Sequence, residues 1–317
     1  MSEAAFLRLE AEAKQPEVFL NQLYPPVNED QASRNRYCNV FPSQSTRVRV
    51  GQDARYINAD WLRPADLRLN GVAVSYIATQ APLEHTRADF WQMVCESNTQ
   101  VIVMLTPVQS GKAEVYWPVA GGRDTELPPS DYAWATNVAA GAPVLPALGF
   151  DQRVFVELLD EHQIHDSLTV RTLRVAQHRG YDSRGDPMVR EHVVRQLHFI
   201  GWPDYGVPSA HDFALLMGEY RRLLDLARVS CGLGMPPTVL AHCSAGVGRT
   251  GTFIAIDLEL QQQQQQQYDS LEQTVRRMRA CRYGSVQTFE QYTFCRDFVA
   301  HCRARGAWTS VASSHTN

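Results

Sequence analysis

The sequence contains no pair of cysteines spaced Cys-x-x-Cys, and its seven cysteines follow no regular interval. Without a Cys-x-x-Cys pair, the sequence does not indicate a zinc site with thiolate ligands. An odd number of cysteines also does not suggest that the fold is held together by disulfides. We therefore expect reduced thiols in an intracellular, cytoplasmic protein. One of the seven, Cys243, has to be explained separately from the others.

The sequence also lacks an excess of basic residues and a long apolar run, and both absences bear on its binding partners. With 30 Lys+Arg against 34 Asp+Glu, the formal charge of −4 supplies no global basic field, so we expect no nucleic-acid partner. No apolar run approaches membrane-spanning length, and the first ten residues carry Glu3, Arg8 and Glu10 instead of an apolar signal core. The hydrophobic share of 44% is enough for a large core. We expect a soluble monomer without a membrane partner.

Apolar runs alternate with helical periodicity along the chain, which predicts α/β or α+β packing rather than repeats. Three segments differ in composition: residues 120–148 indicate a surface insertion, the glutamine run 261–267 an exposed helical extension, and residues 306–317 a flexible tail. The predicted strands are 101–105, 195–200 and 238–241, and the predicted helices are 209–228 and two that begin at caps on Thr86 and Ser270.

The most informative segment runs from Val239 to Phe253 and reads Val-Leu-Ala-His-Cys-Ser-Ala-Gly-Val-Gly-Arg-Thr-Gly-Thr-Phe. An apolar strand is followed by a loop and then by an apolar helix pattern. Two glycines, Gly246 and Gly248, permit backbone angles that turn successive N–H groups inward, which makes a nest for a tetrahedral dianion. The helix N-terminus adds its positive end, and the fork of Arg249 suits two phosphate oxygens.

Cys243 lies where this field is strongest, so we expect a thiolate at neutral pH that attacks phosphorus in line. Thr250 can donate its hydroxyl to the sulfur when the sulfur leaves. His242 is interpreted as an orienting residue rather than a base, since an ionised thiol needs none. Two other interpretations were weighed: a single cysteine is more often a small buried hydrophobe, and a nucleotide loop would require the Gly-Lys-Ser/Thr that is missing here.

This segment resembles the His-Cys-Ser-Ala-Gly-x-Gly-Arg-Ser/Thr-Gly motif of the protein tyrosine phosphatases, in their cysteine-dependent, single-domain non-receptor type. Further matches follow in the family order: Asn35-Arg36-Tyr37, Tyr56-Ile57-Asn58-Ala59, residues 76–83, Asp89-Phe90-Trp91, Tyr116-Trp117-Pro118, residues 202–208, and Gln287-Thr288-x-x-Gln291-Tyr292. The resemblance implies an α/β (α+β) fold with a highly twisted mixed central sheet flanked by helices and a phosphate-binding loop between a strand and a helix N-terminus. It implies a catalytic domain over residues 33–305, preceded by a helical extension, residues 1–32, that packs on it.

The resemblance also implies roles for individual residues. Asp204, on a mobile loop with Trp202 and Pro203 at its hinge side, would protonate the leaving phenolate and later act as a base. Gln287, together with Gln291, would hold the hydrolytic water. The implied contacts to substrate are Tyr37 on the phenyl ring, Asn39 on the peptide backbone, and Ser244, Ala245, Gly246, Val247 and Gly248 around the phosphate. Lys112 would contact the loop of Asp204 when that loop closes over the substrate.

The sequence departs from the family pattern at several positions. Residues 108–111 lack the acidic residue that normally braces the arginine of the motif, so we expect Arg249 to be held differently. Cys95 stands where the family usually has Trp, and Cys38 stands where a basic residue often recognises acidic peptides.

An active phosphatase acting on phosphotyrosine proteins, with no metal or other cofactor, is favoured over two alternatives. A silent binding module would be expected to lose Cys243, Arg249, Asp204 or Gln287, and all four are present. A phosphoinositide phosphatase would favour basic residues at positions 244, 245 and 247, which are Ser, Ala and Val. The pair His162-x-x-His165 lies in a polar context that is typical of solvent-facing histidines rather than of metal ligands.

Overall fold

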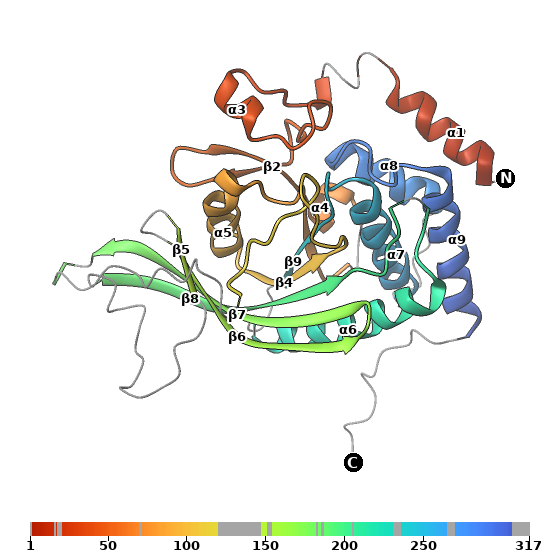
Figure 1. Cartoon of the computed structure of the whole chain (residues 1–317). Helices are drawn as coiled ribbons and strands as arrows, with labels where there is room; N and C mark the ends of the chain where they lie inside the picture. Colours follow the sequence, from red (N-terminus) through yellow and green to blue (C-terminus); the bar gives the residue numbers. More distant parts are fainter. Residues whose placement is uncertain are drawn as a thin grey trace.

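The computed structural model describes residues 2–15, 17, 21–69, 72–119, 147–150, 154–181, 183–184, 187–204, 206–230, 236–264 and 270–305. Within these ranges one mixed sheet organises the molecule, with the strand order β1-β2-β3-β9-β4-β8-β7-β6-β5 (Figure 1). The strands are β1 (Arg47–Val50), β2 (Arg55–Leu62), β3 (Ser75–Thr79), β4 (Thr99–Met104), β5 (Ala147–Phe150), β6 (Val154–His165), β7 (Leu168–Tyr181), β8 (Pro187–Phe199) and β9 (Thr238–His242).

The middle of the sheet is parallel and its two flanks are antiparallel. Strand β9 pairs in parallel with β3 on one side and with β4 on the other, and β4 pairs in parallel with β8. The β1-β2-β3 and β8-β7-β6-β5 segments are antiparallel. The predicted fold class, a mixed central sheet flanked by helices, is therefore confirmed.

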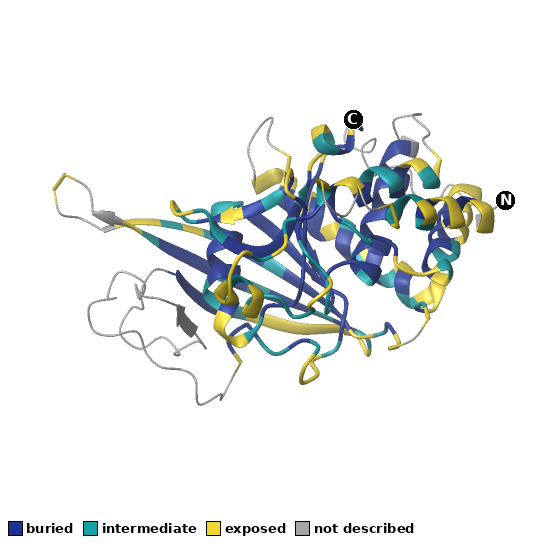
Figure 2. Ribbon diagram, turned by 90° about the horizontal axis from the view of Figure 1, so that it is seen from above, coloured by how far each residue is buried: buried dark blue, intermediate teal, exposed yellow. Residues whose placement is uncertain are grey.

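Alternating side chains of the central strands supply two separate hydrophobic cores. In β4, Val101 and Val103 belong to one core, whereas Ile102 and Met104 belong to the other. This alternation follows from the two-residue period of a strand. Helices α6 (Ala210–Ser230) and α7 (Gly248–Gln264) cover the first face, and α5 (Arg87–Glu96) covers the second. Because both faces are covered, the central strands are buried along their length (Figure 2).

The remaining helical elements are short or lie at the ends of the described chain. They are α1 (Ser2–Ala13), α3 (Glu29–Ser33), α4 (Pro64–Leu67), the 3₁₀ turn η1 (Glu84–Thr86), α8 (Leu271–Cys281) and α9 (Phe289–Ala304). None of the helices in the described ranges is long and apolar enough to cross a membrane.

The secondary structure agrees with the strand and helix predictions, with two corrections. Ser209 and Ser270 accept the backbone N–H groups of Asp212 and Gln273, as capping residues should. Thr86, by contrast, makes no cap bond to α5, and its hydroxyl instead accepts the N–H of Leu83. The predicted strand 195–200 begins earlier, at Pro187, and ends before the exposed Ile200.

The glutamine run was predicted to be an exposed extension, and for its first two residues this is wrong. Gln261 and Gln262 are buried inside α7. The amide of Gln261 donates to the Tyr76 hydroxyl at 2.7 Å and to the Asp257 carboxylate at 3.0 Å, so burial leaves this polar group satisfied. Residues 265–267 lie outside the described residues, as do residues 306–317 and all of the predicted insertion 120–148 except 147 and 148, which begin β5.

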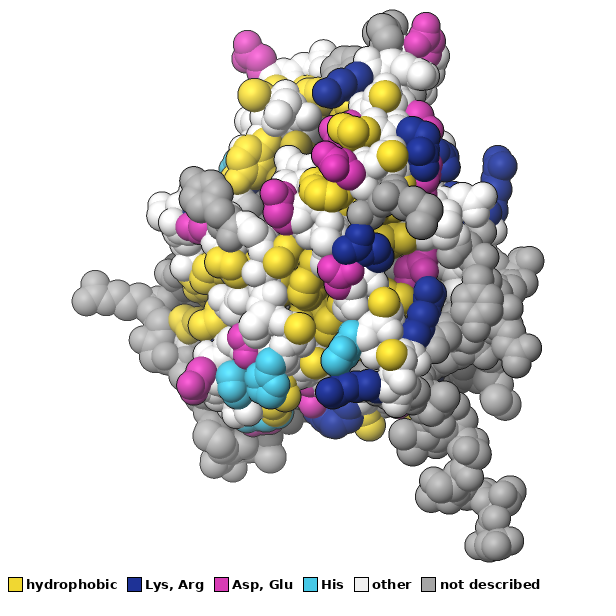
Figure 3. Space-filling model, turned by 90° about the vertical axis from the view of Figure 1, so that its right-hand side faces the viewer, with side chains coloured by type: hydrophobic (Ala, Val, Ile, Leu, Met, Phe, Trp, Pro, Cys, Tyr) yellow, Lys and Arg dark blue, Asp and Glu magenta, His cyan; other side chains and the backbone are white. Residues whose placement is uncertain are grey.

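Helix α1 is attached to α8 by ion pairs over an apolar contact. Arg8 pairs with Glu272 at 2.5 Å, and Glu10 pairs with Arg279 at 2.9 Å. The buried Phe6 and Leu9 join the larger hydrophobic core from the same helix. Figure 3 views the molecule from the side on which α1 and α9 lie in Figure 1, and acidic and basic side chains are interspersed on that face.

Candidate active site

The loop 243–249 begins directly after β9 ends at His242, and its last two residues form the start of α7 at Gly248. Cys243 is only 5% exposed, and its Sγ accepts the backbone N–H of Gly246 at 3.3 Å. The sulfur therefore lies inside the arc of the loop and close to the N-terminal end of a buried helix, where a negative charge is stabilised.

The two glycines of the loop are required for different reasons. Gly246 has φ of +73°, and a Cβ there would lie 2.1 Å from the backbone oxygen of Thr79. Gly248 has no positive φ, which corrects the expectation that both glycines supply unusual backbone angles. At Gly248 a Cβ would instead meet Gln291 at 3.0 Å and Gln287 at 3.1 Å, so glycine admits these two side chains to the loop.

Arg249 is held by backbone carbonyls and by the predicted acid. Its guanidinium donates to the Leu105 oxygen at 3.3 Å and to the Pro203 oxygen at 2.9 Å, and it lies 3.6 Å from the Asp204 carboxylate. This arrangement fits the expectation that the arginine is held without the usual acidic brace. The nearby Glu114 instead pairs with Arg36 at 2.6 Å.

Asp204 lies between two cations at the mouth of the loop. Lys112 donates to Asp204 Oδ2 at 3.0 Å, and Arg249 approaches Oδ1. The hydrogen bond from Lys112, with the charges of Lys112 and Arg249, lowers the pKa of Asp204 below its ordinary value. Lys112 and Arg249, which the family resemblance assigned to the same site as Asp204, both lie beside its carboxylate.

The segment that carries Asp204 is attached to the core through Trp202. The indole is buried and donates to the Gly206 oxygen at 3.2 Å, and its ring packs edge-on against Phe213 at a centroid distance of 5.9 Å. Pro203 and Asp204 beside it are exposed. A fixed aromatic side chain followed by two exposed residues is compatible with a loop that pivots at Trp202.

His242 is buried next to Cys243 and is not exposed to solvent. Its Nδ1 lies 3.0 Å from the Cys243 carbonyl oxygen, and its Nε2 lies 2.7 Å from the Tyr116 hydroxyl. Burial lowers the pKa of His242 to about 4, which keeps the ring neutral at physiological pH. This placement supports an orienting role rather than that of a base.

Tyr37 and Ser244 form one wall of the site. Their hydroxyl oxygens lie 2.8 Å apart, and Ser244 donates to the Lys112 carbonyl at 2.7 Å. The neighbouring Asn39 is exposed, as an expected contact to substrate backbone should be.

The remaining predicted residues are also at the loop. Gln291 accepts the backbone N–H of Gln287 at 2.9 Å, which fixes the two glutamines relative to each other. Thr250 is buried, and its hydroxyl has no hydrogen-bond partner within the described part of the chain. Ala245 and Val247 complete the loop, and the Val247 oxygen accepts the N–H of Gly251 at 2.9 Å.

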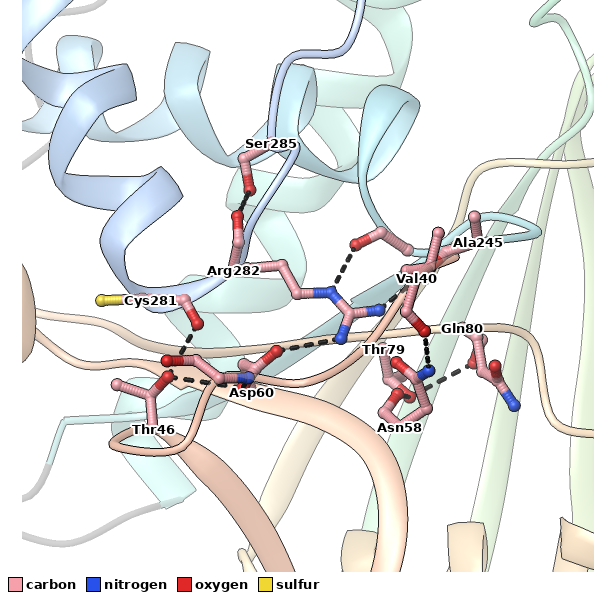
Figure 4. Close-up of polar contacts among 12 residues, drawn as sticks. Val40, Thr46, Asn58, Asp60, Thr79, Gln80, Ala245, Cys281, Arg282 and Ser285 are labelled. Atoms are coloured by element: carbon pink, nitrogen blue, oxygen red, sulfur yellow. Dashed lines mark hydrogen bonds and ion pairs between the residues drawn. The ribbon is translucent and has the colours of Figure 1, made fainter. Parts of the chain in front are cut away.

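Sequence reasoning missed the buried ion pair between Asp60 and Arg282, shown in Figure 4. Arg282 donates to the carbonyl oxygens of Ala245 at 2.9 Å and Gly246 at 3.2 Å, so this side chain supports the loop from behind. Its Nη1 lies 2.9 Å from Asp60 Oδ2, and both side chains are fully buried. Burial raises the pKa of Asp60 to about 6, and the Arg282 charge opposes that rise. No local pattern marks two charges separated by this much sequence.

The described residues hold no group of three or more His, Cys, Asp or Glu side chains able to bind a metal ion. His162 pairs with the exposed Asp160 at 3.1 Å, and His165 contacts Ser167. Both histidines are exposed on β6, as their polar context predicted. Cys95 is buried in the second core, where desolvation raises the pKa of its thiol to about 12, whereas Cys38 is exposed beside Tyr37.

Comparisons with known proteins agree with this geometry. The family model described as protein-tyrosine phosphatase matches residues 31–131 and 149–301. Tyrosine-protein phosphatase non-receptor type 20 of Homo sapiens is 34% identical over 269 residues, 84% of this chain and 53% of that protein. Receptor-type tyrosine-protein phosphatase eta of Homo sapiens is 34% identical over 276 residues, 84% of this chain and 17% of that protein. The chain spans about half the length or less of these two relatives.

Solved structures give the same result. The catalytic domain of human protein tyrosine phosphatase non-receptor type 18 superposes with a TM-score of 0.71 at 29% identity, over 95% of each chain. A structure of PTPN18 in complex with HER2 phospho-peptides has a TM-score of 0.71 at 28% identity, over 95% of this chain and 92% of that one.

Proposed function

Because this chain belongs to the protein-tyrosine phosphatase family, we propose that it hydrolyses phosphotyrosine in proteins through a phosphocysteine intermediate. Residues 33–305 would form the catalytic domain. The observation that carries the proposal is the arrangement of Cys243, Arg249 and Asp204 at the loop 243–249. The sulfur accepts the Gly246 N–H inside the loop, and the guanidinium of Arg249 lies 3.6 Å from the Asp204 carboxylate.

In the first step the Cys243 thiolate attacks phosphorus, and the bond between phosphorus and the phenolic oxygen breaks. The leaving oxygen receives the proton of the Asp204 carboxyl group. Loop N–H groups and the Arg249 fork stabilise the charge on the equatorial oxygens, as preorganised donors do. Tyr37 lines the entrance and sets the depth that a phosphorylated side chain must span, so phosphoserine is too short to reach the sulfur.

In the second step water attacks the phosphocysteine and the sulfur–phosphorus bond breaks. Asp204, now a carboxylate, takes the proton of the water. Gln287 and Gln291 reach the loop at Gly248 and would orient this water. The departing thiolate is stabilised by the Gly246 N–H and by the hydroxyl of Thr250, which has no other hydrogen-bond partner among the described residues.

The first step requires a protonated Asp204, so substrate binding has to raise the pKa of this carboxyl group. In the free protein Lys112 and Arg249 lower the pKa of this carboxyl. A bound phosphate dianion draws the Arg249 fork to itself and adds negative charge nearby. Both effects raise the pKa of Asp204 and favour the protonated acid that the first step needs.

The decisive experiment compares the wild type with C243S and D204A on a phosphotyrosyl peptide, with C295S as a matched control because Cys295 is a buried core thiol. C243S should abolish turnover, and D204A should lower kcat by about 10²–10⁴-fold. The loss in D204A should shrink on an aryl phosphate whose phenol is acidic, because that leaving group needs no proton. Equal turnover by wild type and C243S would refute the proposal.

A further inference from the structure

A series of hydrogen-bonded, buried side chains connects strands β7 and β8 to the loop 243–249. Arg171 of β7 donates from Nη1 to Gln196 Oε1 of β8 at 3.0 Å. Gln196 Nε2 donates to the Tyr116 hydroxyl at 2.8 Å, and that hydroxyl lies 2.7 Å from His242 Nε2. His242 Nδ1 then reaches the Cys243 carbonyl oxygen at 3.0 Å. These four side chains are at least nine-tenths buried.

The direction of every hydrogen bond in this chain is determined by its two ends. The Cys243 carbonyl oxygen favours a proton on His242 Nδ1, and the donors that follow from Arg171 require an acceptor at Nε2, so the two ends together select one neutral tautomer. The Tyr116 hydroxyl therefore donates to His242, and its lone pair accepts the Gln196 amide. A guanidinium only donates, so it holds the amide oxygen of Gln196 toward Arg171.

A second branch leaves the same nitrogen of Arg171. Nη1 lies 3.2 Å from His198 Nδ1, and His198 Nε2 lies 2.9 Å from the Thr106 carbonyl oxygen. Because a guanidinium only donates, Nδ1 must accept from Arg171, and the neutral ring then carries its proton on Nε2, opposite the Thr106 carbonyl. Burial, with the Arg171 charge, lowers the pKa of His198 to about 4, and the ring stays neutral. Thr106 follows Leu105, whose oxygen holds Arg249.

We propose that Arg171 is a positioning residue that fixes the tautomers of His242 and His198 and thereby the donors that hold the Cys243 and Thr106 carbonyls. The activity part of this proposal rests on the proposed phosphatase function. Arg171 itself is fixed from three sides, by its pair with Glu161 of β6, by the two acceptors, and by stacking at 4.4 Å over the Trp117 ring. The orientation of the nucleophile loop thus depends on a residue that contacts neither substrate nor Cys243.

Removing the Arg171 donor should reverse the hydrogen bonds that link Gln196, Tyr116 and His242. In R171M the Gln196 amide can turn its oxygen to Tyr116, the hydroxyl then donates to Gln196, and His242 Nε2 loses its donor. The ring nitrogens of His242 report this directly by NMR, because the two neutral tautomers and the imidazolium have different ¹⁵N shifts. The His242 signals are assigned with H242N.

The test compares R171M with R171K, which keeps a donor, and with R174M. Arg174 lies on the same strand and also pairs across to β6, with Glu157, but its side chain is more exposed than that of Arg171 and no hydrogen bond to Gln196 or His198 is found among the described residues. We expect Nδ1–H His242 in the wild type, R171K and R174M, and a changed tautomer or a protonated ring in R171M. We further expect R171M to lower kcat about tenfold with little change in KM, and R171K to restore most of it.

A wild-type His242 spectrum in folded R171M would overturn the proposal. If R171M does not fold, Q196E tests the same link, because a carboxylate at this position accepts the Tyr116 hydroxyl and removes the donor from His242 Nε2. An unchanged His242 tautomer in Q196E would also overturn it. The NMR readout needs no turnover, so an inactive wild type would refute the phosphatase function and leave this result standing.

Discussion

At the scale of single residues, Asp204 and Lys112 determine the pH range in which the proposed acid is protonated. The hydrogen bond from Lys112 is the largest cause of the lowered pKa of Asp204, and the charge of Arg249 adds to it. Lys112 therefore has two opposite effects. It holds Asp204 through a hydrogen bond of 3.0 Å, and it reduces the fraction of Asp204 that carries a proton.

We expect K112M to shift the alkaline limb of the kcat/KM profile to higher pH. Without Lys112 the pKa of Asp204 rises toward its ordinary value, so the carboxyl stays protonated to a higher pH. The maximal rate should fall at the same time, because the contact that holds the loop is lost. The measurement is the pH dependence of kcat/KM on a phosphotyrosyl peptide. K112R, which keeps the charge, serves as the control, and a limb that stays in place or moves down would contradict the argument.

At the scale of elements, α1 depends on carboxylates whose pKa values are lowered by their arginine partners. The hydrogen bond from Arg8, followed by that from Arg276, lowers the pKa of Glu272 to about 2. Arg276 likewise lowers the pKa of Glu12. A carboxyl with a lowered folded-state pKa stabilises the folded state above its unfolded value, near 4.5, and this contribution is lost as the pH falls toward the folded value.

Acidification from pH 6 to pH 3 should therefore loosen α1 before the rest of the protein unfolds. Phe6 and Leu9 remain buried by the hydrophobic effect, so we expect weaker protection rather than full release. Hydrogen exchange, expressed as protection factors, should show a selective loss in α1 with α6 as the internal control. R8A should show reduced α1 protection already at pH 6. Equal loss in both helices would contradict the argument.

The sequence predicted elements whose signals are local. The caps at Ser209 and Ser270 and the apolar strands at 101–105 and 238–241 each depend on neighbouring residues, and the structure confirms them. Contacts between distant residues carry no such signal. Arg282 supports the loop through Asp60, far away in sequence, and burial of Gln261 depends on Tyr76 and Asp257 rather than on the glutamine run itself.

The residues of the candidate site also divide into those with a local sequence signal and those without one. The spacing from Cys243 to Arg249 indicated an anion site, because loop N–H groups and a helix end are close in sequence. Asp204, Lys112 and Tyr37 could be placed there only by resemblance to the family. The carbonyls that hold Arg249 and the hydrogen bonds of Arg171 depend on how strands meet in the sheet, which the residue types alone do not specify.

At the scale of the whole molecule, the loop 243–249 connects the central strand to a buried helix, so an anion bound there should stabilise the entire domain. Inorganic phosphate at 100 times its dissociation constant would add about 2.7 kcal/mol to the free energy of unfolding. We expect a rise in Tm with phosphate in the wild type and in C295S, and a much smaller rise in R249M. Calorimetry or dye-based thermal scans measure this shift. An equal rise in R249M would place the anion elsewhere.

The position of β9 has a consequence for biosynthesis. This strand lies between β3 and β4 and is the last of the described strands to leave the ribosome. Until residue 242 has emerged, β3 and β4 each present an unpaired edge, and such edges favour pairing with other chains. A nascent chain stalled before this point would lack both a continuous sheet and the phosphate loop. Insertion of β9 therefore joins the two halves of the sheet, and α7, α8 and α9 must follow it before the larger core around the loop 243–249 is complete.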